Sequence, residues 1–295
     1  MVKRKEIKDT DVDMGGTDPR VENDSDSDED IDMVNVDFEW FDPDPEVDFH
    51  GLKNLLRQLF DNDAQDLDMS ALTDLILSQA WMGSTIKTDG KESDPYAFLT
   101  VLNLQEHKDK PIIQSLTHYL HQKATTNTSL SPLVPLLSGA SGAHKIGLLL
   151  TERLINMPAE VVPPMYTMLQ QEIAHAVADH EPFDFSHYLL LSKTYEEVQS
   201  KLDMEESRPL KKGKKSAAGK TDRFFFHPED EVLEKHALCA GSFEYSRKQD
   251  DGHSDSKRAF QELGIRTKGS LILIERGRLE GAVKAMAEYV GAGGQ

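Results

Sequence analysis

The sequence has 295 residues, and its 33 lysines and arginines stand against 52 acidic residues, which gives a formal net charge of −19. This charge argues against a general nucleic-acid binder, because such a protein needs a basic face to displace counterions from phosphates, and it favours a basic partner. The single cysteine, Cys239, excludes a disulfide framework and every multi-cysteine metal site. No apolar run is long enough to cross a membrane, and the charged start predicts no secretory signal, so we expect an intracellular protein.

Acidic residues are concentrated near the N-terminus, where residues 1–48 hold 18 acidic and 5 basic side chains. Residues 1–30 contain too few apolar side chains to offset chain entropy, so they are predicted to be a disordered acidic tail. Ser25 and Ser27 are each followed three residues later by an acid, which acidophilic kinases favour, so both are phosphorylation candidates. The tail either only solubilises the chain or contacts a basic client through the acids at its centre, Asp24, Asp26, Asp28, Glu29 and Asp30.

The ordered part is predicted to begin at residue 31 with a strand. Apolar residues alternate over residues 31–41, and this places Phe38 and Trp40 on one face of the strand. We expect the Trp40 ring to be buried there, in which case its removal would cost about 3–5 kcal/mol. The prolines at 43 and 45 end the strand because they supply no ladder donors.

Helices and strands alternate along the rest of the chain. Residues 52–60, opened by Asp48 as a cap, and residues 68–78 show helical spacing. A turn at 87–91 joins a predicted strand pair at 80–87 and 96–104. Helices follow at 110–124, 142–156 and 159–178, a strand at 185–195, a helix at 228–236, strands at 242–245 and 270–275, a solvated turn at 275–278 and a helix at 279–290. These elements predict one α/β (α+β) domain over residues 31–295, with a mixed, mostly antiparallel sheet flanked by helices.

A second low-complexity stretch interrupts this domain at residues 203–222. It is rich in lysine, serine and glycine and has no apolar period, so we expect a disordered basic loop. Such a loop either balances local acid as a plain solvated segment or carries a nuclear-localisation signal. The candidate residues for that signal are Lys211, Lys212, Lys214 and Lys215.

The turn at residues 138–145 is a candidate phosphate site, because it is predicted to precede a helix whose backbone N–H groups could meet a phosphate. It lacks the Gly-Lys-[Ser/Thr] order of a P-loop, so a helix-starting turn is the better interpretation. The acidic stretch 61–72 resembles a calcium loop, but Asp66 replaces the glycine of position six and Leu72 replaces the glutamate of position twelve. We interpret it as an acidic loop that caps a helix.

The histidines and the cysteine do not indicate a metal site or a catalytic site either. His118 and His121 are three residues apart, but no carboxylate pattern lies nearby to complete a metal site. Cys239 follows His236 in an apolar setting that is typical of a buried, inert thiol. The residues therefore predict no catalytic, cofactor-binding or metal-binding site, and no enzyme.

Several motifs in order resemble the BCCIP/Bcp family of nuclear proteins. Residues 36–43 (Val-Asp-Phe-Glu-Trp-Phe-Asp-Pro) are similar to its Val-Asp-Phe-Glu-Phe-Phe-Asp-Pro signature. The likeness runs from about Ile31 to Tyr289, and the lysines of the basic loop resemble the fungal branch. The other matching stretches are 83–87 with 94–95 and 101–103, 152–158, 164–166, and 225–230.

The resemblance implies a fold like that of the GNAT acetyltransferases without their activity. That class binds acetyl-CoA with a Gln/Arg-x-x-Gly-x-Gly/Ala loop ahead of a helix. Residues 137–143 stand in that kind of place here, but no Gln or Arg precedes the glycines at the right offset. The resemblance therefore implies a fold kept without a cofactor. The alternative is an active acetyltransferase that binds acetyl-CoA at residues 139–142.

The family also implies partners. Its members chaperone a basic large-subunit ribosomal protein (L-twenty-three in yeast naming) and support nuclear export of a lipid kinase, a phosphatidylinositol phosphate kinase. We therefore expect a chaperone and transport adaptor in ribosome biogenesis. It would use importins and exportins and shuttle between nucleus and cytoplasm, without binding nucleic acid or membranes directly. A cell-cycle or DNA-repair scaffold is a further alternative.

Overall fold

The computed structural model describes residues 36–139, 145–197, 223–247 and 265–293. The described residues from Asp37 onward form one compact unit. The predicted acidic tail at 1–30 and basic loop at 203–222 lie outside the described residues, so both stay predictions. No helix in the described ranges combines the length and the apolar character that a bilayer span requires.

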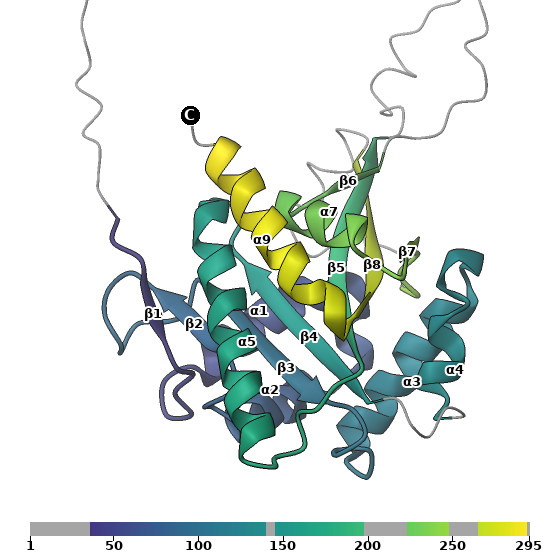
Figure 1. Cartoon of the computed structure of the whole chain (residues 1–295), viewed down its shortest axis with the longest axis horizontal. Coiled ribbons are helices and arrows are strands. Elements are labelled where there is room, and N and C mark those ends of the chain that lie inside the picture. Colours follow the sequence, from purple (N-terminus) through teal and green to yellow (C-terminus); the bar gives the residue numbers. More distant parts are fainter. Residues whose placement is uncertain (1–35, 140–144, 198–222, 248–264, 294–295) are drawn as a thin grey trace, which may run out of the picture. The chain divides into compact units, whose positions relative to one another are not determined.

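The described residues form an eight-stranded sheet (Figure 1). Its order is β1-β2-β3-β4-β5-β8-β7, and β6 pairs with β5 off this path. Neighbouring strands are antiparallel except β4 and β5, which confirms the predicted mixed, mostly antiparallel sheet. The strands are β1 Glu39–Phe41, β2 Ser84–Lys87, β3 Ala97–Asn103, β4 Ile146–Arg153, β5 His187–Glu197, β6 Arg223–Phe225, β7 Cys239–Phe243 and β8 Ile265–Glu275.

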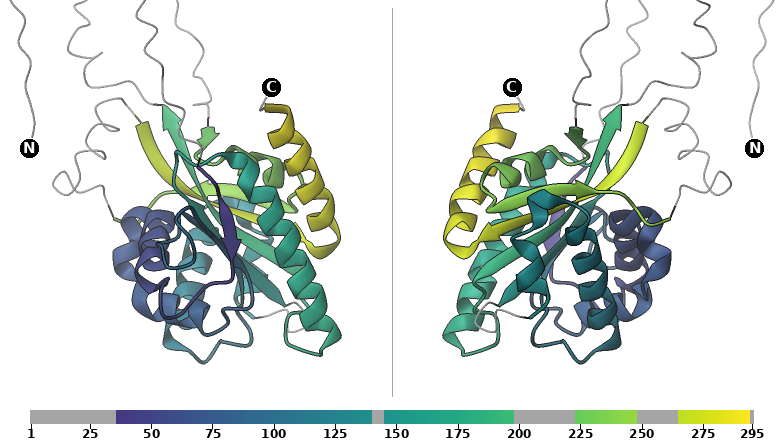
Figure 2. Two further views of the ribbon diagram at one scale, coloured as in Figure 1. Left: turned by 90° about the vertical axis from the view of Figure 1, so that its left-hand side faces the viewer. Right: turned by 90° about the vertical axis from the view of Figure 1, so that its right-hand side faces the viewer.

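Helices cover both faces of this sheet (Figure 2). One face packs against α1 (Phe49–Phe60), α2 (Met69–Leu77), α3 (Pro111–Thr125) and α4 (Leu133–Leu137). The other face packs against α5 (Val162–Ala178), α7 (Pro228–Lys235) and α9 (Arg276–Gly293). Successive residues of a strand point to opposite faces, so Leu148 and Leu150 of β4 belong to the first core and Leu149 to the second. Short 3₁₀ helices occupy Asp61–Asp66, Thr128–Leu130 and Ala159–Val161.

Most predicted elements are present with shifted ends. The strand pair β2–β3, helices α1, α3, α5 and α7, and strand β5 lie where the sequence predicts them. Helix α2 begins as expected at Asp68, whose carboxylate accepts hydrogen bonds from the backbone N–H groups of Ser70 and Ala71. Asp48 precedes α1 without a side-chain capping bond, because its carboxylate binds Lys87 instead.

The helix predicted over residues 142–156 is wrong, because residues Ile146–Arg153 form strand β4. This run is apolar on both faces of the strand, because helices cover both faces of the sheet. An apolar run of this kind has no hydrophobic periodicity that would distinguish a strand from a helix. Gly147 fits this strand closely: a Cβ there would lie 2.9 Å from side-chain atoms of Val101 and Phe185. The first described element after residues 139–142 is therefore a strand, and the helix expected to follow them is not found among the described residues.

Three other expectations are corrected at the sheet margins. Among described residues the first strand covers only Glu39–Phe41, and the Trp40 ring is 39% exposed because β1 is the last strand of the sheet on that side. The expected solvated turn at 275–278 is replaced by a direct junction, with β8 ending at Glu275 and α9 beginning at Arg276. Strand β7 also lies earlier than predicted and includes Cys239, which is half-buried; burial raises its thiol pKa.

Candidate functional site

The parallel strands β4 and β5 separate after a short contact, and buried charged residues fill the space between them. Their pairing runs from Ile146 opposite His187 to Leu149 opposite Leu190, after which the strands diverge (Figure 1). The residues that line the widening space come from both strands and from helix α7: Glu152, Arg153, Ser192, Lys193, His227, Glu229 and Asp230. We call these seven residues the buried network.

Glu152 is the centre of the buried network. Its Oε2 lies 2.6 Å from Lys193 Nζ, and its Oε1 shares a 2.6 Å hydrogen bond with His227 Nε2. The side-chain amide of Gln58, in α1, donates to the same Oε1 at 3.2 Å. Burial raises the pKa of Glu152, but Lys193 and His227 outweigh it, so the net shift is downward and the carboxylate is held ionised.

Helix α7 carries the second half of the buried network. Arg153 donates from Nε and Nη2 to the two carboxylate oxygens of Glu229, at 2.8 and 3.1 Å. Asp230 accepts a 2.6 Å hydrogen bond from Ser192 Oγ, and burial together with the nearby Glu229 charge raises its pKa to about 7. Pro228 opens the helix, and acids in the first turn are favoured by the helix dipole.

Every carboxylate of the buried network is bound by a cation or a hydrogen-bond donor of the same chain. The network joins β4, β5, α1 and α7, and its polar atoms face one another. We assign it a structural role, in which it fixes α7 over the opening between the strands. This cluster is not predicted from the sequence, although five of its seven members lie in the family-like stretches 152–158 and 225–230. The available signal was charge beside apolar runs, as in Lys193 within strand β5 and Glu152 after the leucines of β4.

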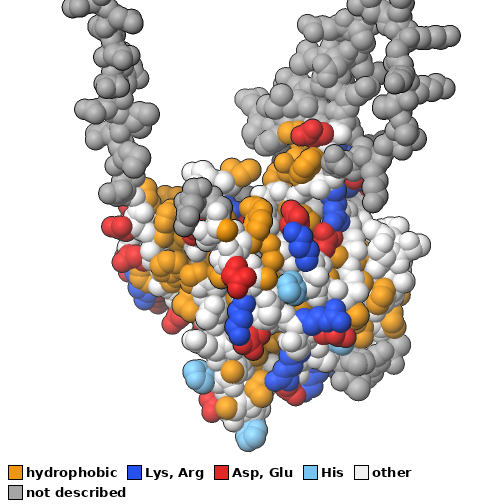
Figure 3. Space-filling model, turned by 45° about the horizontal axis from the view of Figure 1, so that its top comes forward, with side chains coloured by type: hydrophobic (Ala, Val, Ile, Leu, Met, Phe, Trp, Pro, Cys, Tyr) orange, Lys and Arg blue, Asp and Glu red, His pale blue; other side chains and the backbone are white. Residues whose placement is uncertain are grey.

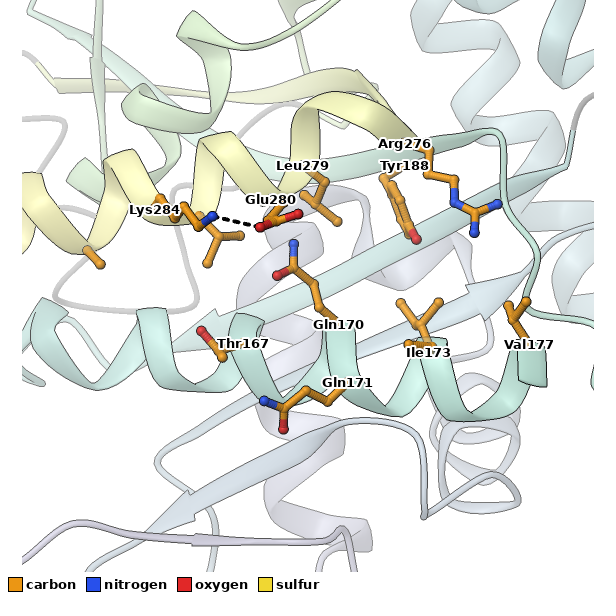
Figure 4. Close-up of a pocket in the computed structure, with 13 residues that line it drawn as sticks. Thr167, Gln170, Gln171, Ile173, Val177, Tyr188, Arg276, Leu279, Glu280 and Lys284 are labelled. Carbon is orange, nitrogen blue, oxygen red and sulfur yellow. Dashed lines mark hydrogen bonds and ion pairs between the residues drawn. The ribbon is translucent and has the colours of Figure 1, made fainter. Parts of the chain in front are cut away.

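An apolar groove of about 620 Å³ lies between α5 and α9 (Figure 4). Ile173, Leu279 and Val283 form its walls, and Tyr188 reaches it from β5; burial raises the Tyr188 pKa. The lysine on its rim, Lys284, is already bound to Glu280 at 2.7 Å. A second hollow of about 500 Å³ continues toward the end of α9 and shares Thr167, Gln171 and Ala287 with the first.

Two cations line the first hollow, and both are already paired, Lys284 with Glu280 and Arg276 with Asp184. Within the described ranges, no group of three or more His, Cys, Asp or Glu side chains could hold a metal ion. His118 and His121 lie on α3, and Asp63 of the former calcium-loop candidate is buried against Lys123 at 2.7 Å. The walls of the groove offer mainly apolar contacts.

The charge of the described residues is strongly unbalanced, with 32 acidic and 18 basic side chains. Two segments around β1 and β2, residues 36–48 and 84–95, contribute nine acids and only two lysines. Both lysines are already paired, Lys87 with Asp48 at 2.6 Å and Lys91 with Asp44 at 2.9 Å. The exposed acids that remain, which we call the acidic edge, are Asp37, Glu39, Asp42, Glu46, Asp89, Glu92 and Asp94.

The site residues predicted from sequence all lie outside the described residues. This holds for the tail acids Asp24, Asp26, Asp28, Glu29 and Asp30, for Ser25 and Ser27, and for Lys211, Lys212, Lys214 and Lys215. They stay predictions. What the structure adds is a group of seven exposed carboxylates at the β1 end of the sheet, on the folded body.

Comparisons with known proteins agree on one family. A model of the BCCIP family matches residues 33–233. The protein called bcp1 of Emericella nidulans is 70% identical over 290 residues, covering 98% of this chain and 99% of that protein. The protein called bcp1 of Schizosaccharomyces pombe is 46% identical over 262 residues, covering 88% of this chain and 92% of that protein. The crystal structure of BCP1 from Saccharomyces cerevisiae is similar with a TM-score of 0.60 at 29% identity, over 92% of this chain and 96% of that chain.

Proposed function

The chain belongs to the BCCIP family, and on that premise we propose that it is a non-enzymatic chaperone and transport adaptor for a basic protein of the large ribosomal subunit. The observation that carries the proposal is the excess of acid on the described body, 32 acidic against 18 basic side chains. The expected client is the ribosomal protein L-twenty-three in yeast naming.

The chemistry of such a client fits an acidic carrier. Ribosomal proteins are basic because they contact RNA phosphates, and before assembly that charge attracts stray RNA. An acidic carrier covers the charge, and its field also raises the rate of encounter with the client. Both the folded body and the N-terminal segment of this chain are acidic, so both can contribute to that field.

The acetyltransferase alternative is less well supported. An acyl-CoA pyrophosphate is held by backbone N–H groups at a helix N-terminus, and the first described element after residues 139–142 is strand β4 rather than a helix. The buried network also occupies the opening between β4 and β5, with every carboxylate already bound. Calorimetry with acetyl-CoA distinguishes the two functions, and micromolar binding would favour the enzyme.

The transport part of the proposal rests on the family resemblance. It includes nuclear localisation, importin and exportin binding and export of a lipid kinase, and the scaffold role is compatible with it. Replacing Lys211, Lys212, Lys214 and Lys215 by alanine in a bulky fluorescent fusion should reduce nuclear accumulation while the fold stays intact. Equal accumulation of the wild type and the variant would leave that segment as a plain linker.

A solubility assay tests the chaperone function. The purified basic ribosomal protein is incubated with RNA, with and without an equimolar amount of this protein. We expect the protein to keep its client soluble and free of RNA, and high salt to abolish this protection because it screens the charges. Aggregation that is the same in both samples would contradict the proposal.

A further inference from the structure

Strand β1 is one end of the sheet that the described residues form. Strand β1 pairs with β2 on one side, and no strand among the described residues lies on its other side (Figure 2, left). The outward backbone N–H and C=O groups of such an edge can pair with an added strand from another chain.

An exposed aromatic ring marks the same edge. Trp40, in the middle of β1, is 39% exposed, and its indole N–H donates to the carbonyl of Val161 at 3.4 Å. This hydrogen bond holds the ring against the residue that precedes α5, and part of the ring stays accessible to solvent. Tryptophan is the side chain whose ring face best attracts a lysine or arginine cation.

The charge around Trp40 decides what can dock there. The acidic edge holds seven exposed carboxylates, and the only lysines of these two segments, Lys87 and Lys91, are already bound to Asp48 and Asp44. Figure 3 shows hydrophobic side chains beside acidic ones on this side of the molecule. Another acidic segment, such as the centre of the N-terminal region, would be repelled, whereas a Lys/Arg-rich segment would be attracted.

We propose that the β1 edge is the docking surface for an extended, Lys/Arg-rich segment of the client. The segment lies along β1 as an added strand, its cations face the acidic edge, and one of them stacks on Trp40. This inference rests on the proposed function, since it names the surface that holds the basic client.

The first test neutralises part of the acidic edge in the full-length protein. The variant Asp37→Asn, Glu39→Gln, Asp42→Asn removes three exposed charges from this surface. Its matched control Glu106→Gln, Asp109→Asn, Glu181→Gln removes three exposed charges near the ends of β3 and α5. We expect the edge variant to bind the basic ribosomal protein about three- to tenfold more weakly than the control, because each exposed ion pair adds a modest amount.

The second test uses the two tryptophans of the chain as reporters. Trp81 is 47% exposed like Trp40 but packs against Phe183 in another part of the structure. In a Trp81→Phe protein, a tryptophan-free arginine-rich peptide should change the emission of Trp40. In a Trp40→Phe protein, the same peptide should leave the emission of Trp81 unchanged.

The outcomes separate the two proposals. If the wild type does not bind the ribosomal protein, the proposed function fails and the inference with it. If the wild type binds, but the edge variant binds as tightly as the control, the β1 edge is not the docking surface and the function stands. Loss of binding on deletion of residues 1–30, with no effect of the edge variant, would likewise overturn the inference and place the client on the tail.

Discussion

Lys193 supplies the cation that offsets the charge of Glu152 in the buried network. The pair is separated by 2.6 Å, and the Glu152 side chain is inaccessible to solvent. Replacing Lys193 by methionine leaves a buried carboxylate without its cation, so we expect the free energy of unfolding to fall by about 3–5 kcal/mol. Urea denaturation measures this loss. The matched control, Lys284→Met, breaks the exposed pair with Glu280 and should leave stability nearly unchanged.

Asp230 makes the stability of the protein depend on pH. Its folded-state pKa is raised from 3.8 to about 7, first by burial and then by the charge of Glu229. An acid with a raised pKa favours the folded state while it is protonated, so this contribution is present in full below about 3.8 and is lost as pH rises from there to about 7. Asp230→Asn removes the titration and keeps an amide beside Ser192. Relative to wild type, the variant should therefore gain stability as pH is raised from 5 to 8.

Urea denaturation at a series of pH values checks the Asp230 prediction. The quantity to compare is the difference in unfolding free energy between wild type and Asp230→Asn, because the titration of all other groups cancels to first order. A difference that does not change over this pH range would show that Asp230 is already ionised in the folded protein at the lower end.

At the scale of the secondary-structure elements, two glycines differ in the space around them: Gly83 is tightly packed and Gly281 is not. Gly83 leads into β2 with φ +114°, and a Cβ there would lie 2.2 Å from the carbonyl oxygen of Leu99. Gly83→Ala should therefore destabilise the β2–β3 pair strongly. In α9, a Cβ at Gly281 meets nothing within 4 Å, so Gly281→Ala should stabilise the protein by about 0.4–1 kcal/mol. Thermal melting of both variants checks the opposite signs.

The strands and helices that the sequence predicts well are those with a clear amphipathic period. Helices α1 and α3 fall within a few residues of the expected ranges. Strand β4 does not, because Leu148, Leu149 and Leu150 are apolar on both faces between two helical layers. The exposure of Trp40 was also unpredictable, since alternation alone does not tell an edge strand from a central one.

At the scale of the whole molecule, the sequence predicts the acidic net charge, and the structure shows where exposed carboxylates cluster. Composition alone predicts an acidic protein with a basic partner. The clustering of exposed carboxylates beside Trp40 is visible only in the structure. It depends on the pairing of β1 with β2 and on the ion pairs that neutralise Lys87 and Lys91. The buried network needs the divergence of β4 and β5, which follows from the register and not from any local motif.

The central claim is that acidic charge brings the basic client to this protein, and association kinetics test it most directly. The rate at which the large-subunit ribosomal protein associates is measured by stopped flow over a series of salt concentrations, for wild type and for a variant without residues 1–30. We expect the wild-type rate to fall steeply as salt rises. The truncated variant should associate more slowly, with a flatter salt dependence and an unchanged melting temperature. A wild-type association rate that is the same at every salt concentration would contradict the account.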